Sequence, residues 1–177
     1  MVMKLISHKV FQEALNYSGP TKRGMELEKL LKNKLFKRIP YKFVDLKDKV
    51  GWLGSERCLL IRKEDEGLHV LHEFCHYLLC SKDRLAYDEF GLGRGFRSNA
   101  MDAKRVLNDA TAYQEEEAVC LLAASFMLHM RMGKGIVGYQ LQDQNFDGYD
   151  KSFFKKSIRF IRNRKKTINK KLGMDLL

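Results

Sequence analysis

Proline and cysteine are scarce in this chain, and long apolar runs are missing from it. The 177 residues include two prolines and four cysteines. No apolar stretch reaches the roughly eighteen residues that a transmembrane helix needs, so we expect no membrane span. Lys4, His8 and Lys9 interrupt the first ten residues, which therefore lack the apolar centre of a secretory signal. We expect a protein of the cytoplasm.

The cysteines do not have the spacing of a zinc ribbon, because none of them forms a CxxC pair. Cys75 and Cys120 lie inside apolar stretches that have helical character, and Cys58 and Cys80 are isolated. We interpret all four as free thiols in a reducing compartment, with those in the apolar stretches buried.

Acidic residues are absent from Lys151–Lys171, which contains ten Lys or Arg. These ten account for all but one unit of the formal net charge of +11. Phe154, Ile158 and Ile161 recur between them at helical spacing, so we expect one amphipathic basic helix over Lys151–Leu172. Nucleic acid, an acidic protein or an anionic membrane surface are candidate partners, and a simple solvated helix face is the alternative.

Apolar spacing along the chain indicates a small domain of mixed class. Leucines at helical spacing predict helices, and short alternating stretches rich in β-formers predict strands. A polar, Gly-rich loop is expected over Ser81–Asn99. We expect an α+β fold, mostly helical, with a small three-stranded sheet. The expected helices are Leu5–Leu15, Glu26–Phe36, Leu68–Leu79, Ala100–Asn108, Thr111–Met130 and Lys151–Leu172, and the expected strands are Tyr41–Leu46, Gly51–Gly54 and Arg57–Arg62.

The stretch from His72 to His76 reads HExxH within an expected helix. Four helical steps turn about 400°, so His72 and His76 lie on one face and can supply two ligands of a tetrahedral zinc site. Glu73 lies about 100° round the helix, where it can reach a water on that metal without being a ligand. The motif therefore predicts a metal site together with a general base.

A zinc site needs a third protein ligand, and three consecutive acids downstream are candidates. Glu115, Glu116 and Glu117 begin a long apolar helix that can pack on the motif helix. Acids at a helix start are also favoured by the helix dipole, so the others can simply face water. The metzincin class is excluded, because Lys82 stands where its further His is required. His69 and His129 are weaker candidates, the first because three ligands on one helix strain a tetrahedron.

These two segments together resemble the ImmA/IrrE family of metallo-endopeptidases, over about residues 25 to 130. The resemblance rests on the stretch from His72 to Leu79 and on the later helix Glu115–Leu128, which follows the family's ExxANxFAAELLMP pattern. It departs from the pattern at Phe74-Cys75, Val119 and Leu128, where the family has Leu-Gly, Asn and Pro.

The resemblance implies a zincin-like metallopeptidase domain with one bound Zn²⁺. By this likeness His72, His76 and Glu115 are the metal ligands, and Glu73 is the general base. Glu116 and Glu117 stay open as alternatives for the third ligand. The likeness also implies a protein substrate, such as a helix-turn-helix repressor of a phage, a mobile element or a stress response. We expect the domain to span residues 1–135, with a basic C-terminal helical extension over 136–177 packed on it.

Three functional questions stay open at this level. The oxyanion of a peptidase reaction needs a second donor, for which Tyr87, Tyr113, Tyr139 or an Arg of the loop over residues 81–99 are candidates. The strand at Arg57–Ile61 could offer an edge to an extended substrate, or could be internal. The alternatives to a peptidase are a regulator that binds DNA or a partner without cutting, and a zinc hydrolase acting on another substrate.

Overall fold

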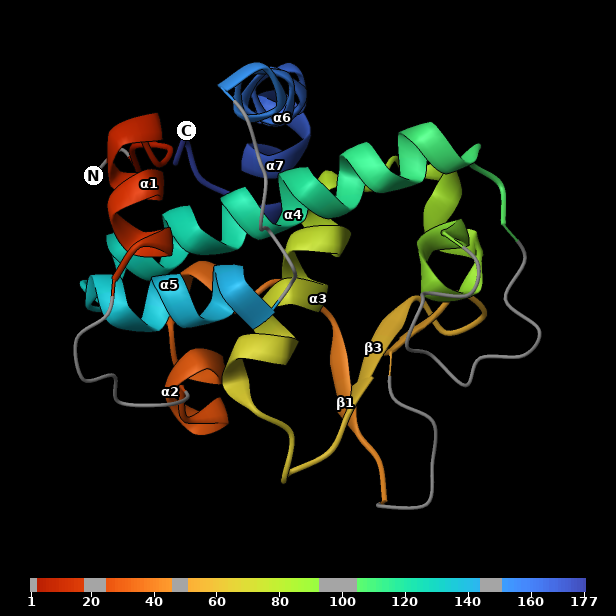
Figure 1. Ribbon diagram of the computed structural model, residues 1–177. Helices are drawn as coiled ribbons and strands as arrows, with labels where there is room; N and C mark the ends of the chain where they lie inside the picture. The colour runs from red at the N-terminus through yellow and green to blue at the C-terminus, as the bar shows by residue number, and fades with distance from the viewer. Residues whose placement is uncertain (1–2, 18–24, 46–50, 93–104, 144–150) are drawn as a thin grey trace.

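Within the residues that the structure describes, the fold consists of seven α-helices and a three-stranded mixed sheet (Figure 1). This computed structural model describes residues 3–17, 25–45, 51–92, 105–143 and 151–177. The expected α+β class with a small sheet is confirmed. The elements are α1 His8–Leu15, α2 Leu27–Leu31, β1 Tyr41–Phe43, β2 Gly51–Leu53, β3 Cys58–Ile61, α3 Gly67–Leu79, α4 Asp109–His129, α5 Lys134–Asp143, α6 Lys151–Asn163 and α7 Lys165–Leu172, with short 3-10 turns η1 Lys34–Phe36, η2 Asp83–Ala86 and η3 Asp88–Gly91.

The sheet has β3 at its centre, in the order β1-β3-β2. β1 runs parallel to β3 and β2 antiparallel to it, so Leu59 is opposite Tyr41 on one side and Trp52 on the other. Leu59 and Ile61 alternate with half-buried residues and point into the core. The idea that β3 offers a free edge to a substrate is wrong, because both of its edges are already paired.

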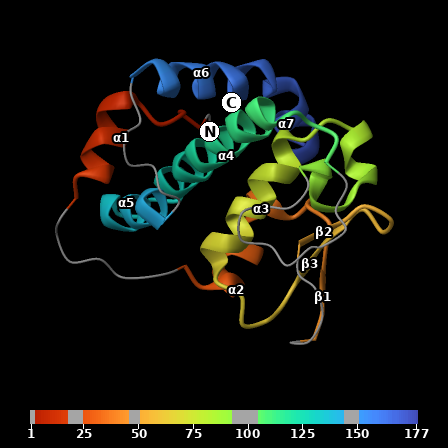
Figure 2. The same ribbon diagram turned by 45° about the vertical axis from the view of Figure 1, so that its right-hand side comes forward.

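α4 is the central helix of the molecule, and α3, α5 and α6 all pack against it (Figures 1 and 2). Its residues from Ala118 to Met127 are buried without interruption. A helix that is apolar on every side is stable only when other elements surround it. The helix begins two residues before the expected Thr111, because the Asn108 side chain accepts a hydrogen bond from the Thr111 amide and acts as N-cap.

The basic C-terminal segment forms two helices, α6 and α7, and the expectation of one helix is wrong. Arg164 lies between them with non-helical backbone angles, and its Nε donates to the carbonyl of Leu79 at the end of α3. Phe154, Ile158 and Ile161 on α6 are buried toward α4. The chain therefore turns where an arginine bonds to another helix, which helical periodicity alone does not reveal.

α5 is a helix that the sequence pattern does not predict, because Gly133, Gly135 and Gly138 resemble breakers. α5 packs closely on α1, and a Cβ at Gly138 would lie 2.1 Å from the carbonyl oxygen of Ala14. Glycine is needed here for close approach of two backbones and not for a turn. The domain boundary expected after residue 135 falls inside this helix.

The remaining expectations are partly outside the described residues. Outside them lie Leu46 of the first expected strand, the part of the expected loop beyond Leu92, and residues 100–104 of the helix expected over Ala100–Asn108. Residues 105–107 of that expected helix are described, and they are not helical. All four cysteines are free, and three of them are buried. Among the helices that are described, none has both the length and the apolar character needed to cross a membrane.

Candidate metal centre

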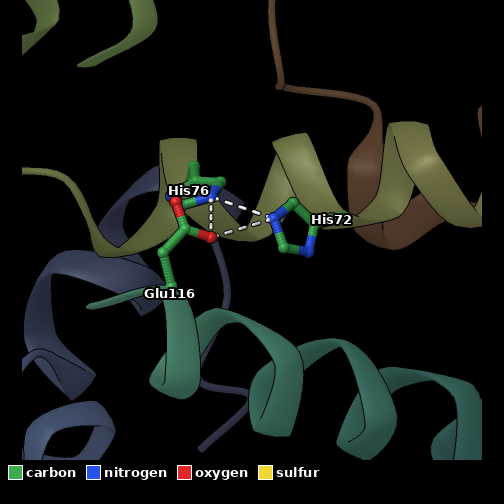
Figure 3. A group of neighbouring side chains, drawn as sticks. All are labelled: His72, His76 and Glu116. Atoms are coloured by element: carbon green, nitrogen blue, oxygen red, sulfur yellow. Dashed lines mark hydrogen bonds and ion pairs between the residues drawn. The ribbon is translucent and has the colours of Figure 1, made fainter. Parts of the chain in front are cut away.

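The motif helix α3 presents His72 and His76 toward α4, as Figure 3 shows. The side chain of His76 is 4% exposed and that of His72 is 12% exposed. Their Nε2 atoms are 3.0 Å apart, so both rings point the same nitrogen at one place. The helical spacing of the motif is therefore realised with the two imidazoles converging.

Glu116 on α4 completes this group. Its Oε2 lies 3.4 Å from Nε2 of His72 and 3.2 Å from Nε2 of His76. Zinc–ligand bonds of about 2.0–2.1 Å at tetrahedral angles place neighbouring ligand atoms roughly 3.3 Å apart, so the triangle matches three corners of a tetrahedron. Within the ranges that the structure describes, His72, His76 and Glu116 are the one set of three potential ligands whose atoms converge in this way.

Glu115, the third ligand expected from the resemblance, lies elsewhere. Its carboxylate is fully buried and accepts two hydrogen bonds from the guanidinium of Arg84, at 2.6 and 2.9 Å. Its nearest approach to the ligand group is 3.8 Å, from Oε1 to Nδ1 of His76. Consecutive helix residues point about 100° apart, so only one of the two acids can face the Nε2 pair. The structure gives that place to Glu116.

Glu115 has the position of an outer partner of the candidate ligand His76. Nδ1 of His76 is buried and has no hydrogen-bond partner, and the Glu115 carboxylate is the charge that faces it. An acid behind a ligating imidazole fixes the ring's tautomer and raises its basicity. Burial alone would raise the pKa of Glu115, but His76 and Arg84 lower it to about 2, so the carboxylate is ionised.

The charges within the group are strongly coupled. Burial alone would raise the pKa of Glu116, but the imidazoles of His76 and His72 hold it well below its ordinary value. Burial alone would lower the pKa of His76, yet Glu116 and Glu115 raise it well above its ordinary value. Protons on the imidazoles therefore balance the Glu116 carboxylate, and a bound cation could take the place of those protons.

Three further residues form the surroundings of the ligands, and motif spacing does not reveal them. Phe90 stacks on His76 with the ring centroids 5.7 Å apart, and its carbonyl accepts a hydrogen bond from Arg84. Sγ of Cys120 lies 3.9 Å from Nδ1 of His72. Arg84 belongs to η2 and Phe90 to η3, two short turns with no helical or strand pattern in the sequence, so no signal in the sequence connects them with α4.

Glu73 lies on α3 beside His72, and its side chain is half-buried. Its charge contributes to the raised pKa of His76, which places it near the ligand group. It does not belong to the three converging ligands. Glu73 is thus the neighbour of His72 on α3, and its role as general base stays a prediction.

The other candidates do not belong to the three converging ligands. His69 is exposed, and His129 is at the far end of α4. Arg84 is committed to Glu115 and to the Phe90 carbonyl, which removes it from the candidates for the oxyanion donor. Tyr113, 49% exposed, is three residues before Glu116 on α4.

Comparison with known proteins adds no relative to this description. No protein-family model matches the chain, and neither a curated protein nor a solved structure matches it. The site is therefore interpreted from its own geometry.

The three neighbouring acids should differ in their effect on metal affinity. Glu116→Gln should weaken zinc binding most, by more than the roughly 10–100-fold typical of an outer partner, and Glu115→Gln should fall within that range. Glu117→Gln is the matched control and should bind zinc as the unmodified chain does. Isothermal titration calorimetry on folded variants measures the order. A larger loss in Glu115→Gln than in Glu116→Gln would contradict the assignment.

Glu117 should make the fold less stable as pH rises. Burial raises its pKa to about 7, against the opposing influence of Lys156 and Ser157, whereas the unfolded carboxyl titrates near 4.5. The protonated carboxyl therefore contributes to the free energy of unfolding fully below pH 4.5, and this contribution is lost as the pH rises through about 7.

The unmodified chain should lose free energy of unfolding between pH 4.5 and pH 8 because of Glu117, and Glu117→Gln should not. The variant should therefore be more stable than expected from the pH 4.5 comparison by on the order of 1 kcal/mol at pH 8, allowing for partial exposure of the carboxyl. Urea denaturation of both proteins at the two pH values measures the difference. An equal pH dependence in the two proteins would show that Glu117 titrates normally.

Proposed function

We propose that this protein is a zinc-dependent endopeptidase. The observation that carries the proposal is the convergence of His72, His76 and Glu116 within the reach of a single ion. Glu73 follows His72 on α3. Two imidazoles and one carboxylate form the ligand set of catalytic zinc sites, which keep the fourth position for water. The same set suits zinc better than magnesium or calcium, which prefer oxygen ligands.

A zinc ion bound there would polarise a peptide carbonyl and lower the pKa of a bound water. Glu73 is the general base: its carboxylate accepts a proton from the attacking water and donates it to the departing amine. His72 and His76 must be neutral to bind the metal, and the Glu115 carboxylate favours a proton on Nδ1 of His76, leaving Nε2 free. The Phe90 ring shields one side of His76 from water.

The resemblance to the ImmA/IrrE family supports a protein substrate for this site. The family pattern covers both helices that build the centre, and a helix-turn-helix repressor is the substrate class that the likeness implies. In this chain the ExxA-type helix contributes its second Glu, Glu116, to the ligand group and its first, Glu115, to the outer position. The proposal therefore keeps the reaction of the family and changes the third ligand.

Glu73→Gln should retain zinc binding and lose proteolysis by several orders of magnitude, because the amide cannot accept the proton. Zinc content by elemental analysis and cleavage of candidate repressor proteins by gel assay test both parts. Glu64→Gln, an exposed acid before α3, is the control and should cleave normally. A chelator should abolish cleavage in the unmodified chain. Full activity in Glu73→Gln would exclude the general-base role.

A second function, binding to a nucleic acid, is favoured by the outer face of α6. We define the basic surface as the exposed Lys151, Lys155, Lys156, Arg159 and Arg162 of that helix. The ion pairs of the described residues all lie elsewhere in the fold.

Lys155, Arg159 and Arg162 follow one another along α6 at rises of roughly 6 and 4.5 Å, so their charges form a stripe that can follow a phosphate backbone. The apolar residues of α6 are buried against the domain. They cannot also insert into a lipid surface, which disfavours the membrane as partner. Glu73 favours the peptidase over a purely binding protein, because a protein that only binds has no need of a general base.

If the basic surface binds duplex DNA, log K should fall linearly with log salt, with a slope of about −0.9 per phosphate contacted. The triple variant Lys155→Glu, Arg159→Glu, Arg162→Glu should lose binding and most of the slope. The control Lys29→Glu, Lys34→Glu, Lys37→Glu changes the net charge equally at exposed positions in and after α2, a helix that lies away from α6 in Figure 1, and should bind as the unmodified chain does. Fluorescence anisotropy measures both. Equal losses in the two variants would indicate a non-specific charge effect.

A further inference from the structure

We propose that Lys171 and Arg164 of the α7 segment are positioning residues for the metal centre, because they complete the C-terminal turn of α3 and thereby fix His76. The inference rests on the proposed function only in taking His76 as a metal ligand. It is carried by hydrogen bonds at the end of α3.

The last turn of a helix leaves carbonyl groups without partners in the helix. At the end of α3 two cations supply those partners. Nζ of Lys171 donates to the carbonyls of Tyr77 and Cys80, the latter at 2.7 Å. Nε of Arg164 donates to the carbonyl of Leu79 at 3.0 Å. Positive charge at this end also matches the negative end of the helix dipole.

The bonded carbonyls are directly connected to the ligand His76. The amide of Cys80 donates to the His76 carbonyl at 2.9 Å, while the carbonyl of Cys80 accepts from Lys171. Tyr77, next to His76 in the chain, has the Lys171 ammonium 4.5 Å from the centre of its ring. The backbone that follows His76 is thus bonded to Lys171 at Tyr77 and at Cys80, and Cys80 is in turn bonded to the His76 carbonyl.

Lys171 and Arg164 differ from the other cations of their segment in their exposure. The remaining eight Lys and Arg between residues 151 and 171 are exposed, whereas these two are half-buried. Burial lowers the pKa of Lys171 to about 8, so the ammonium is held at a cost that an exposed lysine does not have. Lys170, its exposed neighbour, is therefore a matched control.

α7 is itself fixed, which a positioning element requires. The Asn169 side chain accepts hydrogen bonds from the amides of Leu176 and Leu177, at 3.1 and 3.2 Å. The carbonyl of Leu176 accepts one from the amide of Met3 at 2.6 Å. Lys171 therefore projects from a helix anchored to a second segment of the protein.

The experiment compares Lys171→Met, which keeps the aliphatic stem without the charge, with Lys170→Met and Lys171→Arg. Cobalt(II) is the metal probe, because its visible absorption reports coordination geometry. Lys171→Met should bind cobalt about 10–100-fold more weakly and with an altered spectrum, as expected for an outer partner of a ligand. Lys170→Met should match the unmodified chain, and Lys171→Arg should recover most of the affinity.

A metal-free measurement separates this inference from the metal proposal. NMR signals of the His76 ring in the apo protein should shift in Lys171→Met and not in Lys170→Met. If the unmodified chain binds no cobalt but these signals shift, the metal proposal fails and the positioning role stands. Unchanged His76 signals in a folded Lys171→Met protein overturn the positioning role. Arg164→Gln is measured in the same way should Lys171→Met not fold, and an unchanged His76 in that variant likewise overturns it.

Discussion

The packing of α3 against α4 is the constraint on which the rest of the site depends. Each helix alone carries only part of the ligand set, two imidazoles on one and a carboxylate on the other. The apolar residues of both helices are buried, so side-chain packing restricts the rotation of α4 about its axis. In this orientation Glu116 faces the Nε2 atoms of both imidazoles, and Glu115 faces Nδ1 of His76 and the guanidinium of Arg84.

The buried pair of Arg84 and Glu115 has a role beyond stability. Enclosing two charges costs free energy that their attraction only partly offsets, so such a pair is weak evidence for a stabilising function. Here the guanidinium also binds the carbonyl of Phe90, whose ring stacks on His76. One arginine therefore connects α4, the η3 turn and a ligand ring, and the pair specifies the surroundings of the metal centre.

Helix and strand positions could be predicted from the sequence where periodicity determines burial. The motif helix begins one residue before its expected start, and all three strands form within their expected ranges. Glu116 could not be chosen over Glu115, because three adjacent acids look alike until the partner helix sets their direction. Arg84 could not be found either, since its contacts with Glu115 and Phe90 depend on the tertiary path of an irregular segment.

The central position of α4 has a consequence for the order in which the protein is completed during synthesis. α3 leaves the ribosome before α4, but α6 and α7, which cover α4 and the end of α3, follow it. Contacts between segments so distant in the chain form slowly, because the entropy cost of closing the long loop comes before the contacts can stabilise the structure. A nascent chain that stops before residue 151 exposes the apolar side of α4 that α6 later covers. Such an exposed apolar surface is prone to aggregation until the rest of the chain has been made.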